Sequence, residues 1–387
     1  MEIQVRKLWC FKRLLDSKII LIYHLTYTKL SGIIYMYTYS KGDTKMKFIF
    51  FTDSHFHLFT DFSQPDTEYV NDRFKEQIQT LQKVFDIARD NNAKVIFGGD
   101  LYHKRNAVDT RVYNKVFETF ANNQDIQVYM VRGNHDAISN SLYTQSSIDI
   151  FETLPNVEVT KSLRSESLSS KVQLTMCAYG DEIQEIKDFI SKSYVKDRVN
   201  ILVAHLGVSG SLTGKGSHRL EGAFGYQDLL PEQYDFILLG HYHRRQYFQN
   251  PNHLYGGSLL QQSFSDEQES NGIHLIDTEK LTTEYIPLDT RRFITVQGDN
   301  IPSNFDTLKE NGHFLRVVGN QQQVKAMELE NEEDTKNIRM EVQKEFKVEK
   351  RIDNDVTDDP IEITKGFAKK YYPDSEKEIL ECIKECY

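Results

Sequence analysis

Five apolar runs, each followed by a polar side chain, constrain this chain more than any other feature of its sequence. The runs lie at 47–52, 94–98, 126–131, 200–204 and 235–239. They are short and rich in β-branched or aromatic residues, which is typical of buried strands. Because the carboxyl ends of strands border the ligand crevice of an open α/β sheet, we expect the side chains that follow these runs to converge.

Helical patterns separate several of these strands. Helices are predicted at 69–91, 108–121, 141–153 and 182–194. Hairpin-like strands are expected at 156–160 and 172–178, with a mobile serine-rich loop, 163–170, between them. Beyond residue 245 the pattern changes to short strands at 246–249, 253–256, 272–277 and 283–287. Strands alternate with helices in the first part of the chain, and short strands follow without long helices. This order predicts a layered α/β sandwich with two mixed β-sheets.

A smaller unit is predicted beyond residue 290. It combines a strand at 314–318, a helix at 334–346 and a strand at 347–352 into a β-α-β arrangement. An acidic, turn-rich linker then leads to a tail with two helices, at 361–371 and 376–386. We therefore expect four parts, with boundaries at 1–45, 46–290, 291–354 and 355–387.

Residues 1–45 differ from the rest in composition. They hold eight Lys or Arg against three Asp or Glu, and an apolar run at 19–39 that Lys29 interrupts. Because His24 and Gly32 interrupt it as well, the run does not offer the roughly 20 consecutive apolar residues of a membrane span. Met46 opens the first strand, so we interpret 1–45 as a non-native or disordered extension read in frame. The alternative is an arm that touches a membrane or binds a partner.

Charge and cysteine content narrow the function classes. The net charge of −10 argues against a polybasic nucleic-acid binder, but it does not exclude a nuclease whose metal ions face the phosphate. The four cysteines form no CxxC pair, which disfavours a zinc ribbon or a disulfide framework and indicates a reducing cytosol. Local basic residues are candidate phosphate contacts or ordinary surface charges: Lys104-Arg105, Arg244-Arg245, Arg291-Arg292 and Lys215, His218 and Arg219.

The polar residues at the strand ends have the composition of a two-metal site, which needs carboxylate, imidazole and amide ligands. The candidate ligands are Asp53, His55, Asp100, Asn134, His205, His241 and His243. Asp-x-His and His-x-His would place two ligands on one side of an extended segment. Glycines before Asn134 and His241 would permit tight turns. Each motif alone is typical of a turn or a packed loop; together they predict a metal pair bridged by Asp100.

The same motifs resemble those of the calcineurin-like metallophosphoesterases. The matching residues are Asp53-x-His55, Gly99-Asp100, Gly133-Asn134-His135-Asp136, His205 and Gly240-His241-x-His243. Within that superfamily the chain looks most like the SbcD-type DNA repair nucleases of bacteria and phages. The narrower resemblance lies in Gly99-Asp100-Leu101-Tyr102-His103, in 204–210 and in 255–264. It covers 46–290 well and reaches the smaller unit and the tail only by layout.

The resemblance assigns roles to individual residues. It implies that one ion is held by Asp53, His55, Asp100 and His243, and the other by Asp100, Asn134, His205 and His241. The implied ions are two Mn²⁺, with Mg²⁺ as the alternative, although the ligands also suit iron or zinc. His135 resembles a catalytic histidine beside the scissile phosphate. His103 matches a histidine that positions the DNA strand. Asp136 either orients His135 or caps a turn.

The function implied is a metal-dependent DNA exonuclease and endonuclease of recombination and repair. The resemblance further implies a cytoplasmic homodimer without membrane association. It also implies a partner, an SbcC-like coiled-coil ABC ATPase, bound by the C-terminal helices, and a smaller unit that caps the DNA. Two alternatives remain open: a metallophosphoesterase acting on a small phosphodiester or nucleotide, and a non-catalytic scaffold for DNA or the ATPase.

Overall fold

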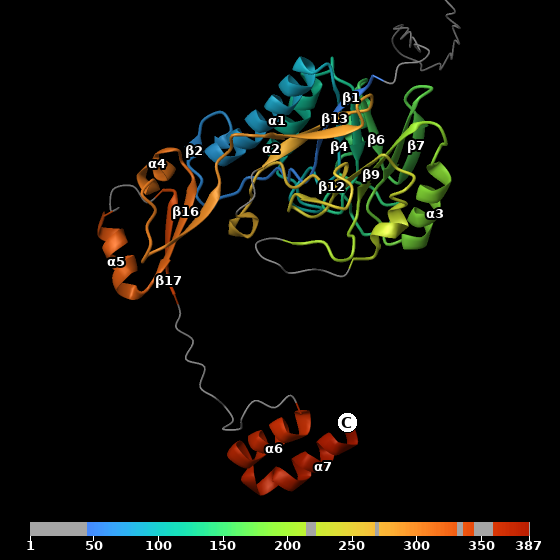
Figure 1. The fold of residues 1–387 in the computed structure, drawn as a ribbon. Coiled ribbons are helices and arrows are strands. Elements are labelled where there is room, and N and C mark those ends of the chain that lie inside the picture. Colours follow the sequence, from blue (N-terminus) through green and yellow to red (C-terminus); the bar gives the residue numbers. More distant parts are fainter. Residues whose placement is uncertain (1–44, 214–221, 268–270, 331–335, 344–358, 387) are drawn as a thin grey trace, which may run out of the picture.

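The computed structural model describes residues 45–213, 222–267, 271–330, 336–343 and 359–386. Within them, two six-stranded mixed sheets stack on each other, with helices on the outside (Figure 1). Three of the sequence-based predictions lie outside the described residues: the extension 1–44, the basic loop with Lys215, His218 and Arg219, and the strand 347–352.

The first sheet joins strands from residues 47–160 with strands from residues 272–287, in the order β14-β13-β1-β4-β5-β6. Its strands are β1 (Lys47–Phe51), β4 (Lys94–Phe97), β5 (Val128–Val131), β6 (Val157–Thr160), β13 (Gly272–Asp277) and β14 (Thr282–Pro287). The first four run parallel, whereas β13 pairs antiparallel with β1 and with β14. A short ribbon, β2 (Pro65–Asp66) and β3 (Val70–Asn71), precedes the first helix.

Two helices cover the outer face of the first sheet. They are α1 (Asp72–Asp90) and α2 (Thr110–Ala121), and each begins at a side-chain cap. Asn71 accepts a hydrogen bond from the Phe74 amide, and Asp109 accepts one from the Arg111 amide. The apolar faces of both helices share one core cluster with the alternate strand residues that point outward, such as Ile49 and Val95.

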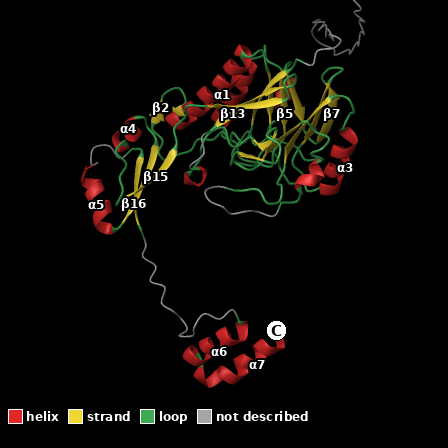
Figure 2. Cartoon of the chain, in the orientation of Figure 1, coloured by secondary structure: helices red, strands yellow, loops and turns green. Residues whose placement is uncertain are grey.

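The second sheet has the order β11-β12-β10-β9-β8-β7. Its strands are β7 (Leu163–Ser167), β8 (Val172–Cys177), β9 (Val199–His205), β10 (Phe236–Gly240), β11 (Gln246–Tyr247) and β12 (His253–Tyr255). The helix α3 (Ile183–Ser193) contacts β7 and β8 of this sheet, and Figure 2 shows it beside β7. Phe50 and Ile96 of the first sheet share a core with Leu202 and Leu238 of the second. The result is the layered α/β sandwich with two mixed sheets that the sequence predicts.

A small parallel sheet follows, in the order β15-β16-β17. Its elements are β15 (Phe293–Gln297), α4 (Phe305–Glu310), β16 (Phe314–Gly319), α5 (Gln321–Glu330) and β17 (Ile338–Val342). It has its own core around Leu315 and Val317. Arg291, just before β15, ties this sheet to α1: its Nη1 lies 2.6 Å from Asp72 Oδ2 and its Nε 2.8 Å from Glu76 Oε2.

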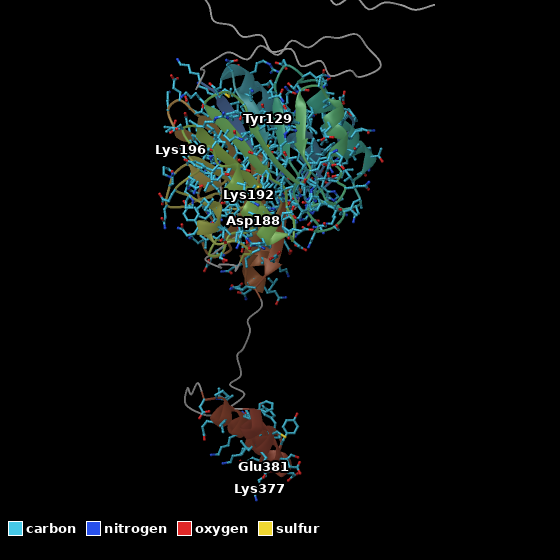
Figure 3. The ribbon with its side chains drawn as sticks, turned by 90° about the vertical axis from the view of Figure 1, so that its right-hand side faces the viewer. Tyr129, Asp188, Lys192, Lys196, Lys377 and Glu381 are labelled. Carbon is cyan, nitrogen blue, oxygen red and sulfur yellow. The ribbon has the colours of Figure 1, made fainter. Side chains whose placement is uncertain are left out.

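The C-terminal tail is helical, as predicted. It comprises α6 (Pro360–Tyr371), the 3-10 turn η4 (Pro373–Ser375) and α7 (Glu376–Cys386). Lys377 and Glu381 lie on α7, and Asp188 and Lys192 lie on α3, as labelled in Figure 3. None of the helices in the described part of the chain combines the length and the apolar run that crossing a bilayer requires.

Four local predictions were wrong. The segment 141–153 is mostly loop and ends in the 3-10 helix η1 (Asp149–Thr153). The supposed mobile loop 163–170 contains β7, and its flanking strands form no hairpin, because β6 and β8 belong to different sheets. The supposed helix 334–346 contains β17, which pairs in parallel with β16; the helix of the small sheet is α5, earlier in the chain. Each error lies where pairing with a distant strand or contact with a distant side chain decides the local structure.

Candidate metal centre

The seven predicted ligands come together where the ends of the two sheets meet. Asp53 and His55 follow β1, Asp100 follows β4 and Asn134 follows β5, all in the first sheet. From the second sheet, β9 ends in His205, and His241 and His243 follow β10. A chain of short distances between side-chain atoms links the seven residues. The site therefore lies between the sheets, at the carboxyl ends of their parallel strands.

Asp53, His55 and His243 form the first cluster, with ligand atoms that all lie within 4.8 Å of one another. The Nε2 atoms of His55 and His243 are 3.0 Å apart, and His55 Nε2 is 4.0 Å from Asp53 Oδ1. Two imidazole nitrogens this close need a proton or a cation between them. With a buried carboxylate beside them, they fit a divalent metal ion.

Asp100 lies at the centre of the site. Its Oδ2 is 3.6 Å from His55 Nε2 and 3.4 Å from His205 Nε2. Its Oδ1 accepts a hydrogen bond of 2.7 Å from the His135 amide, which fixes the plane of the carboxylate. One oxygen thus faces histidines of both predicted ion positions, the placement that a bridging ligand needs.

The second cluster surrounds the side-chain oxygen of Asn134. This Oδ1 is 3.1 Å from His205 Nε2 and 3.0 Å from His241 Nδ1. His205 donates the ring proton on its Nδ1 to the Gly98 carbonyl at 2.8 Å. In the neutral ring, that bond leaves the Nε2 lone pair of His205 directed into the site, as a metal ligand requires.

The backbone places these side chains by left-handed turns. Four ligands have positive φ: Asp53 (51°), His55 (47°), Asp100 (60°) and His241 (104°). Such values are uncommon for residues other than glycine and persist only where the surroundings hold them. Asp-x-His and His-x-His therefore do not align on extended segments, contrary to the prediction. The chain has already left the strand at these positions.

Gly133 and Gly240 serve close approach rather than turning. A Cβ on Gly133 would lie 2.1 Å from Asp100 Oδ1, and one on Gly240 would lie 2.3 Å from the Thr52 hydroxyl. Neither glycine has positive φ. Their value is that the backbone after β5 and β10 passes directly against the groups around the central carboxylate.

Comparison with known proteins agrees with this geometry. The model of the family described as calcineurin-like phosphoesterase matches residues 46–245, more than half of the chain. The chain belongs to the calcineurin-like phosphoesterase family. It is accordingly a metallophosphoesterase-type hydrolase, and the matched residues include all seven candidate ligands.

Two curated relatives are named as the D component of the nuclease SbcCD. The protein of Staphylococcus epidermidis is 24% identical over 266 residues, which is 60% of this chain and 67% of the relative. That of Staphylococcus saprophyticus is 23% identical over 260 residues, or 61% of this chain and 66% of the relative. The chain thus spans about two thirds of the length of these relatives. A solved dimetal phosphatase from Danio rerio is similar over 60% of this chain and 92% of its own, at 10% identity and a TM-score of 0.37.

Burial and neighbouring charges shift the pKa values of several residues in this site in opposite directions. Burial raises the pKa of the Asp53 carboxyl. Burial also raises that of Asp100, but His205 and His55 more than offset this effect and hold its pKa below the usual range. Burial lowers the pKa of His205, whereas the Asp100 and Asp53 carboxylates raise it, to about 9 in balance. His241 is buried with less compensation, which lowers its pKa to about 4 and favours the neutral form that binds metals.

Thr52 and Asp266 also belong to the site, although neither is among the residues predicted from the sequence. The Thr52 hydroxyl donates to Asp53 Oδ2 at 2.7 Å, and Asp266 Oδ1 lies 3.4 Å from His243 Nδ1. Neither residue belongs to a recognisable motif: Thr52 ends an apolar run, and Asp266 lies in a polar stretch. Only the fold shows that they support ligands.

His135 and His103 lie side by side at the edge of the ligand cluster. His135 Nδ1 donates to the His103 carbonyl at 2.6 Å, and the ring centroids of His135 and His55 are 4.8 Å apart. The ring of His103 packs against both His57 and Phe59, with centroid distances of 5.2 and 5.0 Å. Both His103 and His135 are partly exposed, in contrast to the buried His55.

The carboxylate of Asp136 bonds backbone rather than His135. It accepts hydrogen bonds from the amides of Gly133 (2.9 Å), Asp100 (2.9 Å), Leu101 (2.9 Å) and Tyr102 (3.3 Å). The His103 carbonyl occupies the Nδ1 side of His135 instead. Asp136 thus joins the turn after β5 to the turn after β4, and these turns carry Asn134 and Asp100.

Replacing Asp136 with asparagine is expected to lower the free energy of unfolding by about 2 to 3 kcal/mol. The amide nitrogen would face backbone N–H groups that now bond a buried carboxylate, leaving donors without acceptors. Equilibrium urea unfolding followed by circular dichroism measures the change. The exposed Asp188→Asn on α3 is the matched control, and equal midpoints for the two variants would contradict this role for Asp136.

Proposed function

We propose that this chain is a metal-dependent DNA nuclease, with exonuclease and endonuclease activity, that hydrolyses phosphodiester bonds with two divalent ions. The observation that carries the proposal is the position of Asp100, whose Oδ2 faces His55 on one side and His205 on the other. The names of the two staphylococcal relatives, which describe a component of the nuclease SbcCD, support DNA as the substrate.

The residues that would hold the ions are the seven ligands. One ion falls to Asp53, His55, Asp100 and His243, and the other to Asp100, Asn134, His205 and His241. We propose Mn²⁺, with Mg²⁺ as the alternative. When bound, such a pair supplies an activated water and neutralises the charge of the phosphate. The mixed carboxylate, imidazole and amide donor set is consistent with these ions.

His135 is proposed as the residue that handles the leaving group. Because its Nδ1 donates to the His103 carbonyl, its Nε2 carries a proton only in the imidazolium form. That proton can pass to the leaving oxygen as the P–O bond breaks. His103 is proposed to position the DNA strand, with the exposed Lys104 next to it as a cation for the phosphate backbone. Asp136 acts indirectly, through the turns that it joins.

The further parts of the chain suit a nuclease that works on a long substrate in an assembly. We propose a nuclease domain at 46–290, a DNA-capping domain at 291–354 and a partner-binding tail at 355–387. On α6, Ile363, Phe367 and Tyr371 are 40%, 38% and 46% exposed at one-turn spacing, an apolar face that suits a helical partner. An SbcC-like coiled-coil ABC ATPase is the proposed partner, and a cytoplasmic homodimer acting in DNA recombination and repair is the proposed assembly.

Digestion of linear double-stranded DNA by the full chain with Mn²⁺ tests the proposal. Replacing His135 with alanine is expected to slow digestion at least about a hundredfold, because a positioned acid contributes that much. Calorimetric titration should still show two bound ions, since His135 is not among the proposed ligands. Asp188→Asn should digest DNA at the wild-type rate.

Other outcomes would point to other functions. If the wild type hydrolyses only small chromogenic diesters, the substrate is a small phosphodiester and the DNA assignment is wrong. If nothing is cleaved with or without the ATPase partner, the chain is a scaffold. A His135→Ala variant that digests DNA at the wild-type rate would remove this histidine from the chemistry.

A further inference from the structure

The segment Gln261–Glu267 contacts the metal centre on one side and the small sheet on the other. It follows β12 and contains the 3-10 helix η3 (Phe264–Asp266). Residues adjacent in sequence within it face different parts of the molecule. Its first four residues belong to the stretch 255–264 of the narrower family resemblance, whereas Asp266 and Glu267 lie outside every motif named above.

Toward the metal centre, Asp266 faces His243. Its Oδ1 lies 3.4 Å from His243 Nδ1, while Oδ2 accepts hydrogen bonds from the amides of Gln262 (2.8 Å) and Ser263 (3.3 Å). These amides fix the carboxylate plane, so Oδ1 has to face the imidazole. A carboxylate at Nδ1 holds the ring proton there and leaves the Nε2 lone pair for a metal. That Nε2 is the atom 3.0 Å from His55 Nε2.

Toward the small sheet, the neighbours of Asp266 contact β15 and β16. The Glu267 carboxylate accepts hydrogen bonds from the amide (2.5 Å) and the hydroxyl (2.6 Å) of Thr295. The Phe264 ring packs edge-to-face on Phe293, with centroids 4.9 Å apart, and the Arg316 guanidinium lies 4.3 Å from the Phe264 centroid. The segment is therefore held on both sides of Asp266.

A third contact makes this attachment stiff. The side-chain oxygen of Gln261 accepts a hydrogen bond of 2.6 Å from the Phe293 amide, at the first residue of β15. Three residues of the segment are buried: Gln261, Asp266 and Glu267. Phe264 is half-buried. A displacement of β15 would move Glu267, which is bonded to it. Because Asp266 is the neighbouring residue in the chain, it would move as well.

We propose that this segment couples the docking of the small sheet to the metal centre: Asp266 is a positioning residue that holds His243 with its Nε2 toward the ion, and β15 holds Asp266 in place. This inference rests on the proposed two-metal function. It adds a means of regulation, because a small sheet displaced by DNA or by a partner would loosen one metal ligand.

Asp266→Asn tests the positioning role without changing the size of the side chain. The backbone N–H groups of Gln262 and Ser263 need an acceptor, which only the side-chain oxygen of the introduced asparagine can provide. Its NH₂ group must therefore face His243 Nδ1. That NH₂ donates, which moves the ring proton of His243 to Nε2 and blocks metal binding there. We expect one of the two Mn²⁺ ions to bind at least about tenfold more weakly by calorimetry.

Nitrogen-15 spectra of histidine-labelled full chain without metal give a readout independent of activity. The spectra are recorded at a pH above the pKa of His243, which burial lowers but Asp266 and Asp53 raise to about 9 in balance. There the His243 signals, assigned with a His243→Gln sample, should report the proton on Nδ1 in the wild type and on Nε2 in Asp266→Asn. Asp188→Asn, the same change on the exposed face of α3 (Figure 3), should match the wild type in both measurements. Wild-type affinity for both ions in Asp266→Asn, with the proton still on Nδ1, would overturn the positioning role.

The coupling to the small sheet is tested with Asp266 left intact. Glu267→Gln and Phe264→Leu weaken the two contacts with β15 and should each weaken the same ion at least threefold. Wild-type binding of both ions in these two variants would overturn the coupling. A wild type that binds fewer than two ions would overturn the proposed function and this inference together, whereas two ions bound equally by wild type and Asp266→Asn would overturn the inference alone.

Discussion

Replacing Asp100 with alanine is expected to abolish metal-dependent phosphodiester hydrolysis, with a loss of about a thousandfold or more. Its Oδ2 lies within 3.6 Å of His55 Nε2 and within 3.4 Å of His205 Nε2, so one substitution would remove a ligand from both proposed ion positions. A bound ion contributes several kcal/mol of transition-state stabilisation, and each 1.4 kcal/mol is about a factor of ten in rate. The initial rate of Mn²⁺-dependent DNA digestion and the calorimetric stoichiometry of Mn²⁺ measure the effect.

Asp188→Ala on α3 is the control for the same change at an exposed position. It should keep both the rate and the stoichiometry of the wild type. Should Asp100→Ala retain substantial Mn²⁺-dependent activity, Asp100 cannot be the ligand that both ions share, and another group would have to bridge them.

Replacing Arg132 with alanine is expected to lower the free energy of unfolding by about 3 kcal/mol or more. Arg132 is fully buried, and its guanidinium donates to the carbonyls of Lys161 (2.9 Å), Leu142 (3.1 Å) and Tyr179 (2.6 Å). These carbonyls belong to segments that follow strands of both sheets, and each would lose a charged donor; the bond to the Leu142 carbonyl is buried and the other two are partly buried. One such loss costs about 1 to 3 kcal/mol. Urea unfolding followed by circular dichroism measures the sum.

Arg89→Ala provides the comparison with an exposed arginine. Arg89 is 43% exposed and pairs with Asp86 and Asp125, so its loss should cost less than about 1 kcal/mol. Equal destabilisation by the two variants would show that burial of the Arg132 guanidinium is not what makes it important.

The sheets could be predicted from sequence because their strands are apolar runs with distinct ends. The prediction failed where pairing with another strand determines whether a segment is a strand, a helix or a loop. Ile338, Met340 and Val342 alternate with polar residues in a segment predicted as helix, and the pairing of β17 with β16 makes it a strand. Leu163–Ser167 is polar enough to suggest a loop, yet it pairs with β8 over its whole length.

The loop before η1 shows a second kind of failure. A helix was expected from residue 141, but the Glu182 carboxylate bonds the Leu142 amide at 2.7 Å and the Ser141 hydroxyl at 2.9 Å. Arg132 takes the Leu142 carbonyl that a helix would use. Two charged side chains distant in sequence thus hold this segment open, and no local pattern encodes them.

The candidate site divides in the same way. That the seven candidate ligands lie together could be predicted, because acidic, amide and imidazole side chains follow apolar runs in a recognisable sequence. How they are held could not be. The positive φ of Asp53 and Asp100, the amides bonded by Asp136 and the contact of Asp266 with His243 all depend on groups across the site. These are tertiary relations without a local sequence signal.

The pairing of β13 with β1 has a consequence for biosynthesis. Lys47–Phe51 is the first strand of the first sheet to leave the ribosome, and its neighbour Gly272–Asp277 leaves after every strand of the second sheet. Until residue 277 has been made, the β1 edge that carries Phe48 and Phe50 stays open to pairing with other chains. All seven candidate ligands are thus present in the nascent chain before β13, the strand that pairs with β1, has been made.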